Sequence, residues 1–452
     1  MLQPSENTNQ TQEQLEALSL ALDSGSFVHV RQMFNKLPAP TIAHLLESSP
    51  HKARDVLWRL VPKENEGEVL NFLNEDIQSD ILNKLSPKEV ASLTEGLETD
   101  DLADILQQLP DQEVNEVLLA MGDQDRHRLE AVLSYPEDTA GGLLNTDSIT
   151  VRRSHTLDVV LRYLRRHDEI PSMTDNLLVV SRDDHLVGLL PLRKVLVSDP
   201  NLTVSKIMIA DFEAIPVSMP DNEVAQLFER MDWVSAPVIN EDGKLLGRIT
   251  IDDIVDVIRE DADHSFMRMA GLDEEDDTFA PVFKTAKRRA IWLGVNLVTA
   301  FIAASVINRF SNTIDEVVAL AVLMTIVASM GGVAGNQTIT LVIRSMALGQ
   351  IGKTNSLWLM RRELGVGLLN GILWAAVAAL IAIFWFSDNK LAYIFGGAMV
   401  VNLIVAALSG AFLPIFFKKL KIDPALAGSV VLTTITDVVG FLSFLGLAAL
   451  LY

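Results

Sequence analysis

The sequence predicts a multidomain membrane protein: an all-α superhelical N-terminal domain, an α/β pair of repeats, and an α-helical membrane domain with five spans. Three observations support this. The chain has 452 residues and is 49% hydrophobic, which is enough for several domains. Residues 286–452 carry 12 Lys/Arg and 6 Asp/Glu, whereas residues 1–285 carry the other 25 of 37 basic and 53 of 59 acidic residues. Apolar stretches long enough to cross a bilayer, about 20 residues, follow only after residue 285.

Composition narrows the function classes. The formal net charge is −22, and a field that negative repels nucleic acid and attracts cations. The chain has no cysteine, which excludes disulfides, thiolate metal sites and cysteine nucleophiles. The start, MLQPSENTNQTQEQ, is polar and lacks the apolar region of a signal peptide, so we expect the acidic half to remain in the cytoplasm.

Residues 1–134 form the predicted helical N-domain. Apolar residues recur there at spacings of three and four, as in Leu102-Ile105-Leu106-Leu109. Ser86-Pro87-Lys88-Glu89 is a capping box with proline at the first helical position, and similar start signals every 10 to 13 residues predict a small helical solenoid. The acidic helix start carries Asp100, Asp101 and Asp104, which are either dipole-favourable residues on a solvated face or cation ligands.

Residues 135–263 contain two copies of one α/β pattern, about 135–205 and 206–263. The copies align at LVGLLPLRKV, from Leu186, and LLGRITIDDI, from Leu245. We expect helices at 157–166, 222–231 and 252–259, and strands at 176–181, 186–190, 236–240 and 245–250.

This pair resembles tandem CBS domains, which commonly bind adenine nucleotides. In the second copy, Thr250 and Asp253 match the family's G-x-x-T-x-x-D element, and the resemblance implies that they contact ribose and phosphate. The first copy has Pro191 in place of that Thr and Arg193-Lys194 where Arg-Asp is usual. ATP is therefore a candidate ligand, with Thr250, Asp253 and Arg193 as its candidate site. The alternative is that both copies are structural and dimeric.

The last helix of the second copy carries the densest acidic run, with Asp252, Asp253, Asp256, Glu260 and Asp261. Like charges on one helix face are destabilising unless a divalent cation lies between them, and carboxylates suit Mg²⁺ and Ca²⁺. The alternative is a solubilising face. The later run Asp273–Asp277 lacks EF-hand spacing and is interpreted as linker. No closely spaced histidine pair indicates zinc.

The membrane half yields five predicted spans: Ala290–Phe310, Val317–Val342, Leu364–Phe386, Ala392–Phe417 and Ala425–Leu451. Lys and Arg gather before the first span, between the second and third, and between the fourth and fifth. The positive-inside rule then predicts a cytoplasmic N-terminus and an outside C-terminus.

Asp437 lies in the middle of the fifth span, beside Thr433 and Thr434. A charged residue at the bilayer centre costs about 2.5–3.5 kcal/mol on insertion scales and usually faces a bundle interior or a watery path. An aspartyl protease needs two carboxylates, and the spans drawn here hold only Asp437, so we expect no enzyme. A buried Asp that only joins helices remains the alternative.

The second span contains MGGVAGNQ at 330–337, where glycines favour close helix packing. This segment, DPALAGSVVLTTITDVVGF at 423–441 and SYPEDTAGGL at 134–143 resemble the MgtE family of magnesium channels. The resemblance implies a homodimer in a bacterial plasma membrane that takes Mg²⁺ into the cytoplasm. It assigns the pore to Asp437 with Asn336, Thr433 and Thr434, and places Glu316 at the outer mouth.

The resemblance also implies closure by intracellular Mg²⁺, transmitted by a connecting helix at about 264–285 that precedes a membrane domain at 286–452. The implied sensor residues are Asp100, Asp101, Asp104, Gly141, Asp221, Asp252, Asp253, Asp256, Glu260 and Asp261. A CBS-gated chloride channel would have the reverse domain order. The remaining alternative is a non-conducting membrane receptor for divalent cations or adenine nucleotide.

Overall fold

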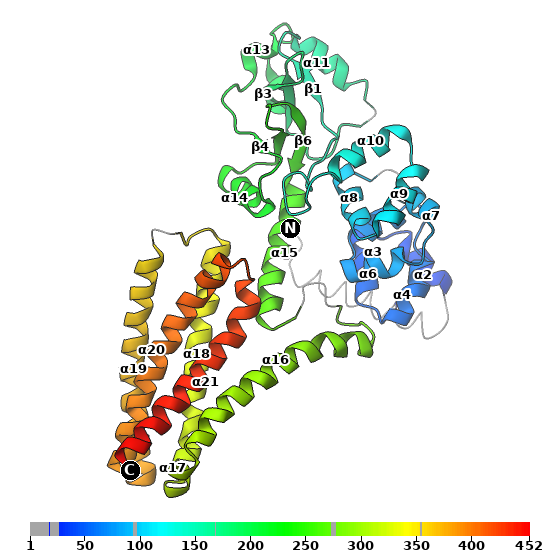
Figure 1. Ribbon diagram of the computed structural model, residues 1–452. Helices are drawn as coiled ribbons and strands as arrows, with labels where there is room; N and C mark the ends of the chain where they lie inside the picture. The colour runs from blue at the N-terminus through cyan, green and yellow to red at the C-terminus, as the bar shows by residue number, and fades with distance from the viewer. Residues whose placement is uncertain (1–17, 19–26, 94–96, 168, 273–276, 353–354) are drawn as a thin grey trace. The chain divides into compact units, whose positions relative to one another are not determined.

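The computed structural model describes residues 18, 27–93, 97–167, 169–272, 277–352 and 355–452. The chain divides into two compact units, and Figure 1 shows their elements. The N-terminal unit comprises residues 1–260 with 275–281, and the C-terminal unit comprises residues 261–274 with 282–452. Each unit has hydrophobic cores of its own.

The N-terminal unit begins with short amphipathic helices, which confirms the predicted helical N-domain. The predicted capping box is present, because the backbone N–H and the hydroxyl of Ser86 donate to Glu89 Oε2 at 2.8 and 2.7 Å. The helices are α2 (Phe27–Phe34), α3 (Ala39–Glu47), α4 (His51–Trp58), α5 (Glu66–Asn71), α6 (Glu75–Leu82), α7 (Pro87–Leu93), α8 (Thr99–Gln107), α9 (Asp111–Ala120) and α10 (Asp123–Val132).

Two small sheets follow, in the predicted duplicate pattern. Each has a parallel pair and an antiparallel hairpin, in the orders β1-β2-β3 and β4-β5-β6. Strands β1 and β4 were not expected, because at three and two residues they are too short to show an alternating pattern. The elements are β1 (Thr150–Arg152), α11 (Leu157–Leu164), β2 (Asn176–Val180), β3 (Leu186–Pro191), α12 (Leu192–Val197), α13 (Val204–Ile207), β4 (Ile215–Pro216), α14 (Asp221–Met231), β5 (Ser235–Ile239) and β6 (Leu245–Thr250).

The hairpins of the two copies pair with each other. The N–H of Leu186 donates to the carbonyl of Gly243 at 3.2 Å, and the N–H of Leu245 donates to the carbonyl of Asp184 at 3.0 Å. The exchange of equivalent bonds is what a pseudo-twofold arrangement of the copies requires, as expected for a CBS pair.

The structure differs from the predicted connecting helix over residues 264–285. Helix α15 runs without a break from Ile251 to Met269, and α16 begins only at Val282. Gly271 ends the first helix with a φ of +72°, a left-handed conformation that favours glycine. Pro281 precedes α16, where a proline marks a helix boundary. Within its described residues, the segment is therefore the end of α15 and the start of α16 rather than one helix.

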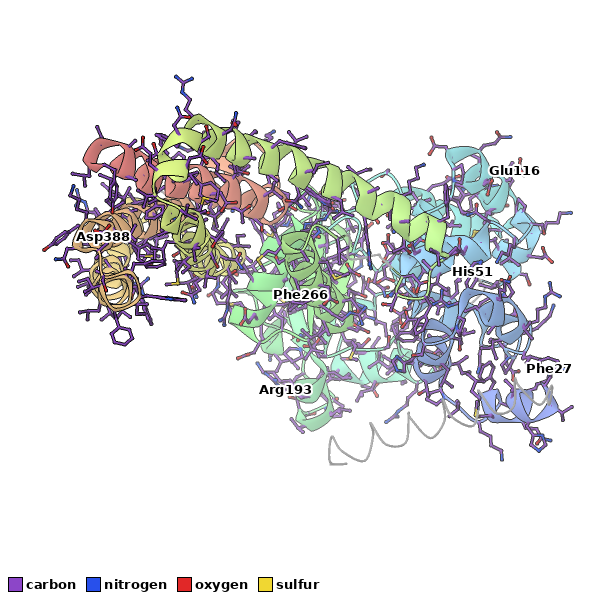
Figure 2. The ribbon with its side chains drawn as sticks, turned by 90° about the horizontal axis from the view of Figure 1, so that it is seen from below. Phe27, His51, Glu116, Arg193, Phe266 and Asp388 are labelled. Carbon is purple, nitrogen blue, oxygen red and sulfur yellow. The ribbon has the colours of Figure 1, made fainter. Side chains whose placement is uncertain are left out.

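The C-terminal unit contains five helices long and apolar enough to cross a membrane, in agreement with the sequence. Helices α18 to α21 pack side by side (Figure 1). Asp388, labelled in Figure 2, caps α20 by accepting the N–H of Lys390 at 2.8 Å. The helices are α16 (Val282–Arg309), the short α17 (Ser311–Glu316), α18 (Ala319–Ala347), α19 (Ser356–Phe386), α20 (Asn389–Lys419) and α21 (Pro424–Leu451).

The acidic run at 273–277 is only partly described, since residues 273–276 lie outside the described ranges. Asp277 forms a bidentate ion pair with Arg54 of α4, with distances of 2.5 and 2.9 Å, and both side chains are nearly inaccessible to water. Arg54 also donates to the carbonyls of Leu46 and Glu47 at 3.0 and 2.9 Å. The segment just before the first membrane helix is thus fixed to the N-terminal helices.

Replacing Arg54 with Met should lower the free energy of unfolding of the N-terminal unit by about 3–5 kcal/mol, because the buried carboxylate of Asp277 loses the guanidinium that pairs with it. Lys84→Met is the control, since Lys84 pairs with Asp55 in an exposed position where the expected loss is about 0–1 kcal/mol. Urea unfolding measures both. Equal, small losses in the two variants would contradict the importance of the buried pair.

Candidate functional site

The first helical turns of α8 and α15 bring carboxylates together inside the N-terminal unit. Asp100 of α8 is only 4% exposed, and neither of its carboxyl oxygens has a hydrogen-bond partner among the described residues. Burial, and next the negative charge of Asp253, raise the pKa of Asp100 well above its usual value. Asp253 Oδ2 accepts the hydroxyl and the N–H of Thr250 at 2.9 and 3.3 Å. Burial and the charge of Asp252 nevertheless raise the pKa of Asp253 to about 7.

The same electrostatic cluster extends along both helices. Burial, opposed by a hydrogen bond from Asn71 Nδ2 at 2.8 Å, raises the pKa of Asp101 to about 6. The pKa of Asp104 is also raised, by the surrounding protein and by Glu137 and Asp101, although the residue is partly open to water. Ionised together, these groups repel one another.

The C-terminal side of the cluster is built around Glu260. Burial and Asp256 raise its pKa, and Asp221 at the start of α14 and Glu137 act in the same direction. Sequence reasoning missed Glu137, although the 134–143 motif contains it, and Glu98, whose charge raises the pKa of Asp101 and Asp100. Repulsion across several elements is invisible in a linear pattern.

The predicted sensor residues therefore fall into three groups. The electrostatic cluster contains Asp100, Asp101, Asp104, Asp221, Asp252, Asp253, Asp256 and Glu260. Gly141 is buried and lies four residues after Glu137 in the sequence. Its N–H donates to the hydroxyl of Thr139 at 3.3 Å. Asp261 is exposed on α15, in the part of that helix that belongs to the C-terminal unit.

The cluster fits a hydrated cation better than a directly ligated one. Within the described residues, no three His, Asp or Glu side chains are close enough to hold a metal directly. Mg²⁺ dehydrates reluctantly and usually keeps several waters when carboxylates bind it. Both carboxyl oxygens of Asp100 are buried and have no hydrogen-bond partner among the described residues, and the pKa of the neighbouring Asp253 is raised. This arrangement is therefore suited to a hydrated divalent cation.

The predicted pore residues of α21 lie on one side of that helix. Thr433 and Thr434 are four and three residues before Asp437, and Thr433 is exposed whereas Asp437 is half-buried. The hydroxyls of Thr433 and Thr434 donate to the carbonyl of Val430 at 3.0 and 2.8 Å, so their oxygens remain free to accept.

The other two predicted pore residues are not in contact with this face. Asn336 is exposed on α18 and Glu316 is exposed at the end of α17. Among the described residues, no hydrogen bond joins either one to Asp437. The structure thus brings the α21 residues together and leaves Asn336 and Glu316 on surfaces of their own.

Asp437 is not the only carboxylate in a membrane helix, so that premise of the sequence analysis is wrong. Glu363 lies within α19, is 3% exposed, and contacts Arg362 Nη1 at 2.6 Å and the Thr338 hydroxyl at 3.3 Å. The sequence analysis began the third span one residue later because arginines precede it. Glu363 is occupied by these two partners, and no hydrogen bond links it to Asp437 among the described residues.

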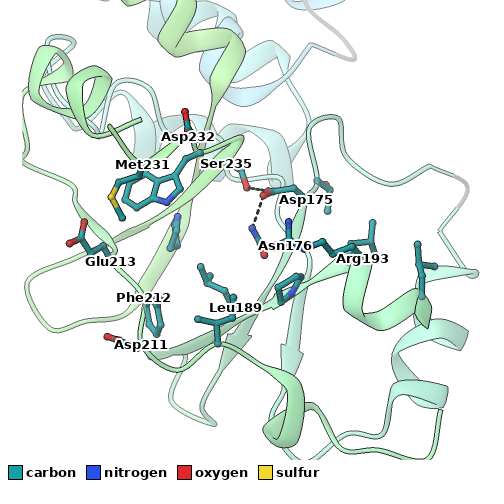
Figure 3. A pocket seen from close by; sticks show the side chains of 17 residues that line it. Asp175, Asn176, Leu189, Arg193, Asp211, Phe212, Glu213, Met231, Asp232 and Ser235 are labelled. Carbon is teal, nitrogen blue, oxygen red and sulfur yellow. Dashed lines mark hydrogen bonds between the residues drawn. The ribbon is translucent and has the colours of Figure 1, made fainter. Parts of the chain in front are cut away.

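A cavity of about 720 Å³ lies between the two copies of the α/β repeat (Figure 3). Trp233 and Phe212 provide aromatic walls, and Asp175 accepts hydrogen bonds from Ser235 and Asn176. Of the predicted nucleotide residues, Arg193 lines this cavity, whereas Thr250 and Asp253 do not. Those two belong to the acidic cluster instead.

Three family models cover most of the chain. A divalent cation transporter model, MgtE, matches residues 324–447, the MgtE intracellular N domain matches 37–138, and the CBS domain matches 140–199 and 204–260. The chain is 31% identical to the magnesium transporter MgtE of Thermus thermophilus over 442 residues, covering 96% of this chain and 98% of that protein. Identity to the Bacillus subtilis magnesium transporter MgtE is 29% over 320 residues, 71% of each chain.

Among solved structures, the cytosolic domain of the Mg²⁺ channel MgtE in complex with ATP is similar to this chain. The TM-score is 0.50 at 31% identity, over 54% of this chain and 99% of that one.

Without divalent cations, the N-terminal unit should lose stability as the pH rises from about 4 to about 7. The folded-state pKa values of Asp101 and Asp253, about 6 and about 7, lie above the usual 3.8, so the unfolded chain releases its protons first. The folded state is therefore penalised as the pH rises through this window. The urea-unfolding midpoint of residues 1–281 at each pH is the measurement.

Asp253→Asn should flatten that decline, and Mg²⁺ at pH 7 should restore much of the lost stability. Asp183→Asn, in an exposed turn, is the matched control and should leave the profile unchanged. A midpoint that rises between pH 4 and pH 7 would show that the cluster does not store repulsion.

Proposed function

Because the chain belongs to the MgtE family of magnesium transporters, we propose that it is a channel that takes Mg²⁺ into the cytoplasm and closes when internal Mg²⁺ is high. The observation that carries the gating proposal is Asp100, a buried carboxylate that has no hydrogen-bond partner in the described part of the chain and that interacts with the charge of Asp253. Its ionised form is costly unless a cation lies nearby.

Mg²⁺ supplies that cation. At high internal concentration, hydrated Mg²⁺ neutralises the carboxylates of α8, α14 and α15 and keeps these elements together. At low concentration the ionised groups repel one another and the elements separate. The cluster thereby converts ion concentration into a conformational free energy, since Mg²⁺ stabilises only the state that binds it.

Helix α15 supplies the mechanical connection. Its first turn carries Asp252 and Asp253, and its last residue, Met269, packs in a core with Ile339 of α18 and Leu432 of α21. His264 of α15 lies 3.4 Å from Asp423, the N-cap residue of α21. A displacement of α15 therefore acts on the helix that carries Asp437.

The conducting path is proposed to be formed by two copies of the chain. Asp437 is half-buried in one copy and lies on a face with Thr433 and Thr434, where an ionised group needs water or a partner. In a homodimer, two such faces supply two carboxylates and accepting hydroxyl oxygens to a hydrated Mg²⁺. Asn336 and Glu316 are proposed as further contacts along the path. Almost none of the apolar part of α16 is buried within one copy of the chain, so this helix leaves room for the partner and for lipid.

The proposed location is a bacterial plasma membrane. Basic residues gather in the first turns of α16, around the end of α18 and the start of α19, and around the end of α20, and the positive-inside rule favours the cytoplasmic side for those ends. The N-terminal unit is then cytoplasmic, where internal Mg²⁺ reaches the cluster, and the C-terminus is outside. The proposed role is transport without a chemical reaction.

The cavity of the repeat pair is proposed to bind the adenine nucleotide. Trp233 offers an aromatic face to the base, and Arg193 offers a cation to phosphate. The lining also has the carboxylates of Asp175, Asp211, Glu213 and Asp232, which repel a bare phosphate chain. The nucleotide is therefore expected to enter as its Mg²⁺ complex.

Trp233→Ala should weaken ATP binding about 10-fold, because loss of an aromatic–base stack costs about 1–3 kcal/mol. Titration calorimetry with ATP at fixed Mg²⁺ measures the effect, and Tyr163→Ala, an exposed aromatic outside the cavity, is the control. Unchanged affinity in Trp233→Ala would move the nucleotide elsewhere.

Mg²⁺ flux into liposomes, measured while the Mg²⁺ concentration on the cytoplasmic side is varied, tests the channel itself. The wild type should conduct at low and close at high internal Mg²⁺. Asp437→Asn should reduce flux at least 10-fold, because a carboxylate of the proposed conducting path loses its charge. Flux in no variant, including the wild type, would favour the non-conducting receptor.

The same assay separates pore from sensor. Asp253→Asn should retain flux at low Mg²⁺ but close less steeply, since fewer repelling carboxylates remain for the ion to neutralise. Asp183→Asn is again the control. Closure of Asp253→Asn with the wild-type midpoint and steepness would remove the cluster from the gating mechanism.

A further inference from the structure

Helix α20 carries a fully buried amide, Asn402, between two other membrane helices. Its side chain is 0% exposed, and Nδ2 donates to the backbone carbonyl of Val327 in α18 at 2.7 Å. The amide oxygen Oδ1 is also buried and has no hydrogen-bond partner among the described residues. Packing alone does not account for this residue, since leucine has the same branched shape and would bury no unpaired oxygen.

Two glycines on facing helices make room for the amide. A Cβ on Gly331 of α18 would lie 2.2 Å from Asn402 Nδ2, and a Cβ on Gly440 of α21 would lie 3.0 Å from the same atom. The amide therefore lies at a close approach of α18, α20 and α21. Any side chain at Gly331 would collide with it.

This junction lies next to the residues that the proposed function assigns to the ion. Gly440 is three residues, about one helical turn, after Asp437 on α21. Gly331 is five residues before Asn336 on α18. Asn402 thus contacts both helices that carry the proposed ion contacts without belonging to the exposed faces that hold them.

We propose that Asn402 is a positioning residue for ion passage. Its hydrogen bond to Val327 fixes the rotation and separation of α18, α20 and α21, and so the position of the Asp437 carboxylate relative to Asn336. In a regular helix the Val327 carbonyl accepts the N–H of Gly331, so the Asn402 amide uses the second lone pair at the glycine contact. The inference rests on the proposed function, because it assigns a role in Mg²⁺ transport.

Replacement of Asn402 by Leu removes the hydrogen bond and keeps the branching at Cγ. We expect the variant to assemble as the wild type does. Its apparent KM for Mg²⁺ in liposome flux should rise about 10-fold, and its preference for Mg²⁺ over Ca²⁺ should fall. The reason is that an ion site whose helices are less firmly positioned binds its ion less tightly and less selectively. Met399→Leu, a buried, volume-conserving change one turn away on α20, is the control and should alter neither quantity.

A second pair of variants covers the case in which Asn402→Leu fails to assemble. Gly331→Ala alone should disrupt assembly, because its Cβ collides with the amide, and Gly331→Ala with Asn402→Ala should restore assembly but not the wild-type KM or selectivity.

The inference is overturned if an assembled Asn402→Leu variant, or the assembled double variant, keeps the wild-type KM and the wild-type preference for Mg²⁺ over Ca²⁺. Asn402 would then be a packing residue. Absence of flux in the wild type would instead contradict the proposed function, so the two failures are distinguishable.

Discussion

The structure depends on carboxylates that α8 and α15 hold against one another without enough partners. Asp100 is the extreme member, since both its carboxyl oxygens are buried and have no hydrogen-bond partner among the described residues. A protein of marginal stability, roughly 5–15 kcal/mol in all, tolerates such a group only where its cost is recovered in some state. In the function proposed above, that state is the one in which a hydrated divalent cation neutralises the carboxylates, and the excess of acidic residues before the membrane helices supplies the rest of the charge.

A different constraint acts on the membrane helices, because lipid offers no hydrogen bonds to their polar groups. Glu363 is paired with Arg362 and Thr338, and Asn402 is bonded to a helix carbonyl, so both are held inside the bundle. Asp437 is half-buried on α21, and among the described residues no side chain donates to it. Fully enclosed polar groups fix the helices, whereas Asp437 keeps access to an ion.

Local sequence patterns predicted the features of the structure that depend on neighbouring residues. The Ser86–Glu89 box, the apolar stretches of the spans and the duplicated strands depend on near neighbours or on length, and they appeared where expected. The turn between α15 and α16, the Arg54–Asp277 pair and the glycine-lined place of Asn402 depend on contacts between distant residues. For the same reason, the sequence located the acidic cluster but not Glu137, nor the partners that occupy Glu363.

The central claim is that Mg²⁺ holds α8 and α15 together and that their separation opens the pore. The chain has no cysteine, so two cysteines introduced together at the exposed positions Glu116 of α9 and Glu229 of α14 can be spin-labelled specifically in the full-length protein. Electron–electron distance measurement across a Mg²⁺ titration should give a distribution that shortens and narrows, with the same midpoint as closure of flux. A distance that stays constant while flux closes would contradict the account.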